Sequence, residues 1–252
     1  GADLRGASFE GADMTEAEVD GARLHGANFS SSILTGVALE EMRNSGVDLS
    51  NTVTDENIGP SVDDLDEPLE NLVKAHRSWV GSVGQSGKPL DLSGYDLRPL
   101  FSLEEEKLTA LKAEGSRWCG MDLSGIQLQN SKLDGADFRR AVMRGADLRA
   151  SSMKNAMLSH VDLSGADLSP LYFERGGEKI SSITNLQVAN MKYVKLSKAK
   201  LIEANLKGAD LSYADLSGAD LSYADLRGAI FEGALLDGVK SDGAKLDDGV
   251  TL

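Results

Sequence analysis

The sequence predicts an all-β solenoid, because one five-residue pattern recurs along most of the 252-residue chain. Large apolar residues stand five positions apart, and a small residue, commonly Ala, stands two positions before each of them. A period of five matches neither a helix nor a continuous strand. The intervening Gly, Asp, Asn and Ser favour turns. A short strand with both apolar residues on one side, followed by a turn, stacks into a solenoid when it is repeated.

The pattern forms three runs. In the first run, within residues 1–50, the large residues are Leu4, Phe9, Met14, Val19, Leu24, Phe29, Leu34, Leu39 and Leu49, with one miss at Asn44. The second run extends from Trp118 to Leu168, and the third from Leu186 to Leu246. The clearest stretch reads GADLSYADLSGADLSYADLRGA, at residues 208–229. The first residues already follow the pattern, so we expect a fragment or processed chain whose true N-terminus is missing. The first run amounts to about two and a half coils, and we expect it to stack either on coils missing from this chain or on the main β-helix that the later runs form.

The motif A-(D/N)-L-x-x resembles the repeat of the bacterial pentapeptide-repeat family, although no particular member is indicated. The resemblance implies a right-handed, quadrilateral β-helix with four units in each coil. The departures from the pattern add one or two short helices and a projecting hairpin to this architecture. They divide the chain into a first block at residues 1–50, a linker with a helix at 51–89, and a main β-helix at 90–252.

The helix is expected at about residues 65–83, after a polar and acidic linker at 51–64. Leu69, Leu72 and Trp79 fall at helical spacing, and a proline stands near the start of the segment. The end coils of a solenoid must be covered. We therefore expect these three residues to cap the open apolar end of the main β-helix, with partner binding by the helix as the alternative.

The main β-helix has a first interruption, near residues 98–115. Ser102 and Glu105 could form a capping box, and the composition of residues 102–114 favours a short helix. Leu103 and Leu108, however, keep the five-residue register, which favours an irregular coil. We predict the short helix.

A second interruption lies at residues 170–183, where Gly176 and Gly177 stand between the segments YFER and EKIS. A pair of glycines between two such segments predicts a β-hairpin. Loops on a rigid scaffold often carry function, so the hairpin is the candidate interaction site, with a tolerated insertion as the alternative. The candidate residues include a lysine group that follows the hairpin: Tyr172, Phe173, Arg175, Gly176, Gly177, Lys192, Lys195 and Lys198.

The sequence contains no constellation for catalysis, metal binding or a cofactor. His25, His76 and His160 are scattered without metal spacing, and Cys119 lies too far from His160 in the repeat for a Cys–His pair. The glycines at residues 81–87 miss the spacing of a phosphate loop. We therefore predict that the protein is not an enzyme.

The net charge of −14 is unevenly distributed. It is −6 for residues 1–50, −7 for 51–115, +1 for 116–170 and −2 for 171–252. Direct nucleic-acid binding is not expected, because it needs clustered Lys and Arg. A lone cysteine fits a reducing compartment, and no apolar stretch is long enough to span a membrane, so a cytoplasmic location is expected.

A rigid solenoid without active-site chemistry predicts a non-catalytic scaffold for a protein partner whose identity the sequence does not reveal. The family resemblance gives the alternative, a DNA-mimicking modulator of DNA gyrase or topoisomerase that protects against quinolones. The near-neutral main β-helix weighs against this alternative. Ile230, Phe231, Leu235 and Leu236 are predicted either to close the C-terminal end or to form a homodimer contact.

Overall fold

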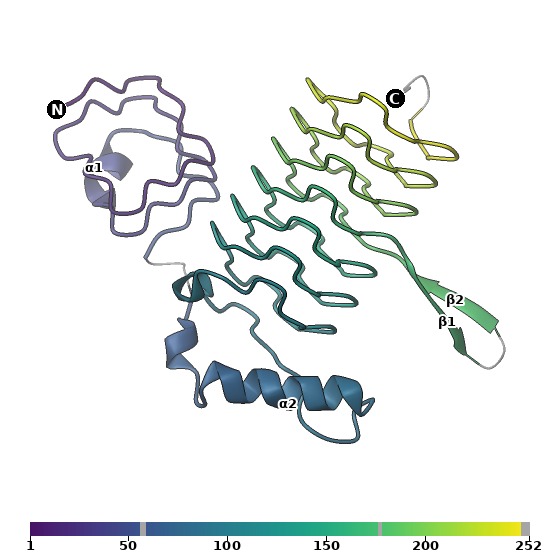
Figure 1. The fold of residues 1–252 in the computed structure, drawn as a ribbon. Coiled ribbons are helices and arrows are strands. Elements are labelled where there is room, and N and C mark those ends of the chain that lie inside the picture. Colours follow the sequence, from purple (N-terminus) through teal and green to yellow (C-terminus); the bar gives the residue numbers. More distant parts are fainter. Residues whose placement is uncertain (56–58, 176–177, 248–252) are drawn as a thin grey trace. The chain divides into compact units, whose positions relative to one another are not determined.

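The computed structural model describes residues 1–55, 59–175 and 178–247. The chain divides into two compact units, Gly1–Gly59 and Pro60–Leu252. Regular elements are few: α1 (Leu39–Asn44), η1 (Val62–Asp64), α2 (Leu69–Gly81), η2 (Arg98–Leu100), β1 (Leu171–Arg175) and β2 (Glu178–Ser182). Most of the remaining described chain consists of turns joined by isolated parallel bridges, which stack into coils in each unit (Figure 1).

The bridges of the second unit join residues that are mostly 20 positions apart, so one coil contains 20 residues. The bridged residues line up in four columns. Column A runs from Asp91 to Lys245, column B from Ser61 to Ile230, column C from Ser102 to Leu235, and column D from Lys107 to Lys240. The chain passes from one column to the next in steps of five residues, as the repeat predicts.

The core of this unit consists of the residues on either side of each column position. Around Asp210 of column B, for example, the side chains of Ala209 and Leu211 are fully buried. The same Ala and Leu pair recurs along the stack, so every coil contributes a layer of small and medium side chains. Rings enter this core only at a few places, such as the stacked pair of Trp118 and Phe138.

The first unit has the same 20-residue spacing, with bridges such as Asn28 to Asp48. Helix α1 replaces one repeat unit of a coil, where the pattern predicts an ordinary unit centred on Leu39, and the bridges around it keep the 20-residue spacing. That expectation is wrong, because Leu39 begins a helix; Leu39 packs against the core while partly buried, and Met42 is fully buried in it. The miss at Asn44 marks the end of α1.

The expected linker at residues 51–64 is also wrong at both of its ends. Val53 pairs with Ile33 and is buried, so the coil of the first unit continues past residue 50. Ser61 pairs with Asp96, and Val62 is buried in the core of the second unit. Residues 56–58 lie outside the described part of the chain.

Helix α2 lies across the end of the second unit at which the coils begin (Figure 1). Leu65, Leu69, Leu72 and Val73 pack against the core of the first coil. The helix is shorter than the expected span of 65–83, because it begins directly after Pro68 and ends at Gly81. Leu65 contacts the core from outside the helix.

Residues 102–114 form coil and not the expected helix. Ser102 and Lys107 make column bridges to the next coil, and Leu108 is buried in the core. Ser102 does not make a capping box with Glu105: its Oγ accepts a hydrogen bond from the Glu104 N–H, which closes a turn. The interruption reduces to η2 and one extra residue, so the bridge spacing is 21 residues at Asp96 and returns to 20 at Ser102.

The hairpin predicted at 170–183 is present as the antiparallel pair β1 and β2, in which Phe173 pairs with Ile180. Figure 1 shows it projecting from the side of the coils. The bridge from Ser152 to Asn185 spans 33 residues, and spacing then returns to 20. The insertion therefore leaves the columns in register. Gly176 and Gly177 lie outside the described residues.

No helix within the described ranges has the length and apolar character needed to cross a bilayer.

Candidate interaction site

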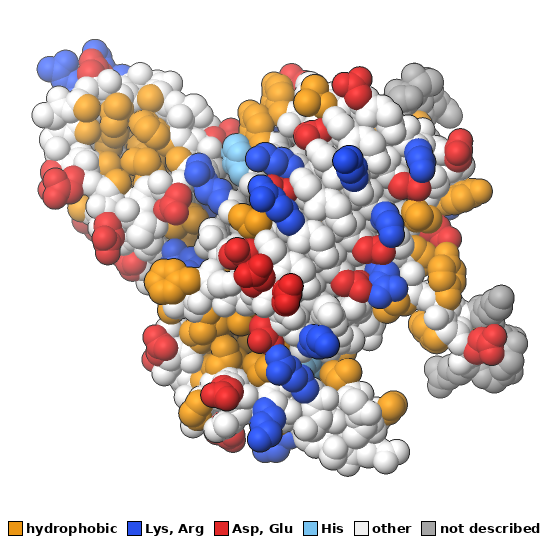
Figure 2. Space-filling model, viewed as in Figure 1, with side chains coloured by type: hydrophobic (Ala, Val, Ile, Leu, Met, Phe, Trp, Pro, Cys, Tyr) orange, Lys and Arg blue, Asp and Glu red, His pale blue; other side chains and the backbone are white. Residues whose placement is uncertain are grey.

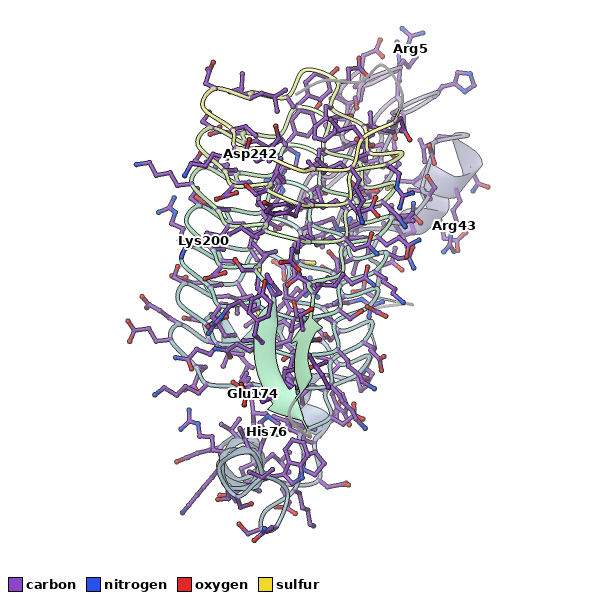
Figure 3. All side chains as sticks on the ribbon, turned by 90° about the vertical axis from the view of Figure 1, so that its right-hand side faces the viewer. Arg5, Arg43, His76, Glu174, Lys200 and Asp242 are labelled. Carbon is purple, nitrogen blue, oxygen red and sulfur yellow. The ribbon has the colours of Figure 1, made fainter. Side chains whose placement is uncertain are left out.

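The hairpin leaves the stack at the corner between columns D and A. The side chains of Tyr172 and Phe173 are 64% and 48% exposed, respectively. Because side chains alternate along a strand, Leu171 and Phe173 lie on one face of the hairpin, and Tyr172 and Glu174 lie on the other. Figure 3 labels Glu174 on this projecting element.

Tyr172 fixes the hairpin to the coils behind it. Its hydroxyl donates a hydrogen bond of 2.7 Å to Oε1 of Glu203, which lies at the same corner in a later coil. This hydrogen bond, with smaller contributions from burial and the Glu203 charge, raises the pKa of Tyr172. The hairpin is thus oriented by a contact outside its own two strands.

Removal of this contact is expected to loosen the hairpin. In Tyr172→Phe the hydrogen bond to Glu203 is lost, and the amides of β1 and β2 should exchange with solvent about 2–10 times faster, as one hydrogen bond is worth about 0.5–1.5 kcal/mol. Hydrogen–deuterium exchange measures this directly. Tyr223→Phe is the matched control, because the Tyr223 hydroxyl has no hydrogen-bond partner among the described residues. Equal exchange in both variants would contradict the anchoring role of Tyr172.

A groove of about 540 Å³ lies at the base of the hairpin. Ile183 and Tyr223 give it an apolar wall, and both are exposed. Its polar lining consists of Glu203, Asn205, Lys207, Asp225 and Lys245, with Gly243 at its edge. Exposed apolar and aromatic side chains next to a polar rim are typical of protein contact surfaces.

Asp225 is the most strongly held charge in this groove. Arg227 donates two hydrogen bonds to its carboxylate, and Lys207 Nζ lies 3.2 Å from Oδ2. These contacts, led by the one with Arg227, keep the pKa of Asp225 far below its usual value. The carboxylate therefore stays ionised and locally neutralised at any physiological pH.

The lysines that follow the hairpin do not join it in one site. Lys192 follows Asn190 of column B, and Lys195 stands in column C, whereas the hairpin leaves the coil between columns D and A. Lys198, exposed, lies at the corner that follows Lys195. Lys192 Nζ is 3.6 Å from Asp210 in the next coil. Neighbours in sequence become separated around the coil.

Ion pairs are common in the second unit, both within one repeat unit and between residues of adjacent coils. Arg149 pairs with Asp147 at 2.6 Å, and Arg144 pairs with Asp162 at 2.7 Å. Lys200, labelled in Figure 3, is 3.6 Å from Asp167. Figure 2 shows basic and acidic side chains interspersed over the visible coils. No continuous acidic face is seen there.

The four residues named for the C-terminal end separate into two pairs. Phe231 and Leu236 pack inward against the core and are partly buried. Ile230 and Leu235 stand in columns B and C and are 49% and 56% exposed. The first pair belongs to the core of the last described coil, and the second pair belongs to its outer surface.

Of the residues expected to cap the other end, Leu69 and Leu72 pack against the core, whereas Trp79 stacks on His76 with ring centroids 5.8 Å apart. His76 is fully buried and was not singled out from the sequence. Its position on the same helical face as Leu69 and Leu72 is the signal that could have indicated it.

The other candidate chemical groups are separate. His25 is exposed in the first unit, and His160 stacks on Tyr193 with centroids 4.8 Å apart. Cys119 is buried, and burial raises the pKa of its thiol well above the usual value, which suppresses the reactive thiolate. Within residues 1–55, 59–175 and 178–247, no three His, Cys, Asp or Glu side chains are grouped to hold a metal ion.

Comparison with known proteins identifies the family. The model of the pentapeptide repeats matches in 8 copies, at residues 1–30, 122–156, 142–169, 189–228, 199–238 and 214–248. The chain belongs to the pentapeptide-repeat family, which confirms the resemblance drawn from the A-(D/N)-L-x-x motif. No curated protein matches the chain.

Solved structures that are similar to the chain include two pentapeptide-repeat proteins and a fluoroquinolone resistance protein. Rfr23 from the cyanobacterium Cyanothece 51142 is 25% identical over 48% of this chain, with a TM-score of 0.27, and the match spans 64% of Rfr23. HetL of Nostoc sp. strain PCC 7120, a protein involved in heterocyst differentiation regulation, is 24% identical over 99% of this chain and 89% of its own, with a TM-score of 0.25.

A trypsin-treated form of QnrB1, a plasmid-mediated fluoroquinolone resistance protein, is 19% identical over 98% of this chain and 85% of its own, with a TM-score of 0.36. TM-scores this low give no argument for shared function. The family assignment rests on the repeats.

Proposed function

We propose that this protein is a non-catalytic scaffold in the bacterial cytoplasm that binds a protein partner through the hairpin and the groove at its base. The stack would be the right-handed, four-sided β-helix that the family resemblance implies. The observation that carries the proposal is the hairpin, which displays Tyr172 and Phe173 while a hydrogen bond to Glu203 holds it against the coils.

The energetic argument rests on preorganisation. Aromatic side chains contribute much of the binding energy at protein interfaces, and a surface that is already ordered loses less entropy on binding. Both conditions hold for Tyr172, whose ring is 64% exposed although its hydroxyl is bonded. Ile183 and Tyr223 extend the apolar surface into the groove. A partner that inserts an apolar side chain between charged flanks would fit this lining.

The test is affinity purification from the native cell with quantitative mass spectrometry. We expect the double variant Tyr172→Ser and Phe173→Ser to reduce recovery of the partner at least tenfold. A tenfold loss of affinity corresponds to about 1.4 kcal/mol, and the truncation of a single hot-spot residue costs more than that. The matched control is Phe101→Ser, which removes an 81% exposed aromatic ring from the first coil. A set of partners that is unchanged in the hairpin variant, or lost equally in the control, would contradict the proposal and favour a tolerated insertion.

The gyrase alternative is supported by the acidic charge of the first part of the chain, −6 on residues 1–50 and −7 on residues 51–115. The second unit argues against it, since several of its column carboxylates, among them Asp147, Asp162 and Asp225, are paired with Arg or Lys. A DNA mimic needs a continuous acidic face. Purified protein at micromolar concentration is therefore expected to leave gyrase supercoiling and its quinolone sensitivity unchanged. A clear effect in this assay would establish the alternative over the scaffold.

A further inference from the structure

His76 lies buried between α2 and the first coil of the second unit, with none of its side chain exposed. Figure 3 labels it on the helix at the end of the stack. Its Nε2 is 2.9 Å from the carbonyl oxygen of Thr109, and the Leu90 N–H donates a 3.0 Å hydrogen bond to its Nδ1. Both ring nitrogens are therefore engaged with the backbone.

The contact with Thr109 replaces a hydrogen bond that the coils make among themselves. In later coils, the carbonyl oxygen two residues after a column D position accepts a hydrogen bond from an amide of the preceding coil. The Ala110 N–H donates to the Gln129 carbonyl at 2.8 Å, and the Asn130 N–H donates to the Arg149 carbonyl at 2.9 Å. Thr109 holds this position in the first coil, and His76 provides its donor. The imidazole thus occupies the place of a preceding coil in the backbone ladder.

This geometry requires the neutral imidazole. Nδ1 must be the acceptor, because the Leu90 N–H points at it, so the proton lies on Nε2 and is donated to Thr109. An imidazolium carries N–H groups on both nitrogens. Protonation would set two donors against each other at Leu90, in a buried site where an unsatisfied polar group is costly.

We propose that His76 is a pH-sensitive latch: while neutral it holds α2 over the first coil, and its protonation releases the helix and uncovers the apolar end of the stack. The uncovered residues would include Leu92, Leu97 and Leu108, which line that coil. This proposal concerns the opposite end of the unit from the hairpin groove and does not depend on partner binding there.

The hydrogen bonds of His76 contribute to holding α2 on the first coil, because apolar packing does not fill the space between them. A groove of about 520 Å³ lies along the helix between Leu69 and Val73 on one side and Leu100 and Leu103 on the other. Leu69, Leu72 and Val73 pack against the first coil but leave this space unfilled, so hydrogen bonds supplement the apolar contact. Besides His76, the Lys88 N–H donates to the Ala75 carbonyl and Arg77 pairs with Glu106.

The charged groups of α2 are Glu70, Lys74 and Arg77, those beside Leu90 are Lys88 and Asp91, and those nearest Thr109 along the first coil are Glu106, Lys107 and Lys112. Burial, partly offset by the hydrogen bond to Thr109, lowers the pKa of His76 below 6.5. The released form therefore binds more protons than the latched form. The stability that the latch provides is present above the ordinary His pKa and decreases as the pH falls below it.

Hydrogen–deuterium exchange at about pH 7.5 and about pH 5.5 tests the latch, since this window lies above the ordinary titration of carboxylates. After correction for the intrinsic exchange rate, the protection of the amides of residues 69–81 is expected to decrease up to roughly tenfold at the lower pH. This limit is set by the protonated fraction of a released imidazole, which rises roughly tenfold between the two pH values. Protection of residues 205–226 should not change. Unchanged protection of residues 69–81 would overturn the proposal.

The variant His76→Gln removes the titrating group and should abolish the pH-dependent part of this change. His25→Gln is the matched control, because His25 is exposed in the first unit, and it should keep the wild-type pH dependence. A pH dependence that persists in His76→Gln would refute the latch. If that variant does not fold, ¹⁵N NMR of the wild-type imidazole decides: the neutral Nε2–H tautomer is expected at the higher pH, and any other state would overturn the proposal.

Discussion

Replacing Leu201 by Ala is expected to lower the free energy of unfolding by about 2–5 kcal/mol. The Leu201 side chain is fully buried, and it follows column D between Leu168 and Leu221 of the adjacent coils. The coils on both sides are held at strand spacing by backbone hydrogen bonds, so they cannot move together to fill the deleted volume. Chemical denaturation of the variant and wild type measures the loss.

Leu236→Ala is the control for this substitution. Leu236 makes the same kind of inward contact, but it lies in the last described coil and is only partly buried. Its removal costs less transfer free energy and leaves a smaller cavity. If both variants lost the same stability, the layered core would not be the main source of stabilisation.

The second large effect is expected for Gly87→Ala, which should lower stability by about 3–5 kcal/mol, in the range of severe steric mechanisms. Gly87 has a φ of +78°, and a Cβ at this position would lie 2.1 Å from the Ala75 oxygen and 2.7 Å from the Trp79 nitrogen. The segment after α2 could then no longer return along the helix. Denaturation and the amide exchange of residues 69–81 report the damage.

Gly94→Ala separates the clash from the backbone strain. Gly94 has a similar φ of +75°, but no heavy atom lies within 4 Å of the Cβ position. This variant should lose only the cost of placing an L-residue in the left-handed region, about 1–2 kcal/mol. Losses of equal size in the two variants would mean that Gly87 is required for its φ alone.

The sequence predicts the coils well because each one is built from the same short pattern of inward and turn residues, which recurs every five positions. A small and a large inward residue, such as Ala209 and Leu211, flank most column positions, and the pattern is repeated too often to be accidental. The 13-residue insertion at the hairpin was visible as a loss of register. Periodicity therefore predicts both the stack and the place where an element leaves it.

Composition was misleading where it conflicted with register. Residues 102–114 contain strong helix formers, yet Leu103 and Leu108 continue the core of the coils, and burial of apolar side chains outweighs helix propensity of a few tenths of a kcal/mol per residue. The reverse occurred at α1. A helix of 6 residues formed where Met42 could reach the core and Asn44 could not, a difference that a five-residue template misses.

The candidate site was only partly predictable. Tyr172 and Phe173 follow from the hairpin, but the bond to Glu203 joins residues 31 positions apart and depends on the way coils stack. Of Lys192, Lys195 and Lys198, only Lys195 stands in a column, and the other two lie at the corners before and after it, away from the corner that carries the hairpin. His76 required knowledge of which carbonyl at the end of the stack lacks a neighbour.

The return to 20-residue spacing after the hairpin has a consequence for how such a protein can change. The two ends of an inserted segment need only meet at a corner, about one strand spacing apart, so its length and composition are free of the coils' own requirements. A corner can acquire or lose a recognition element in a single genetic event while the framework stays intact. Framework and recognition element can thus evolve at independent rates.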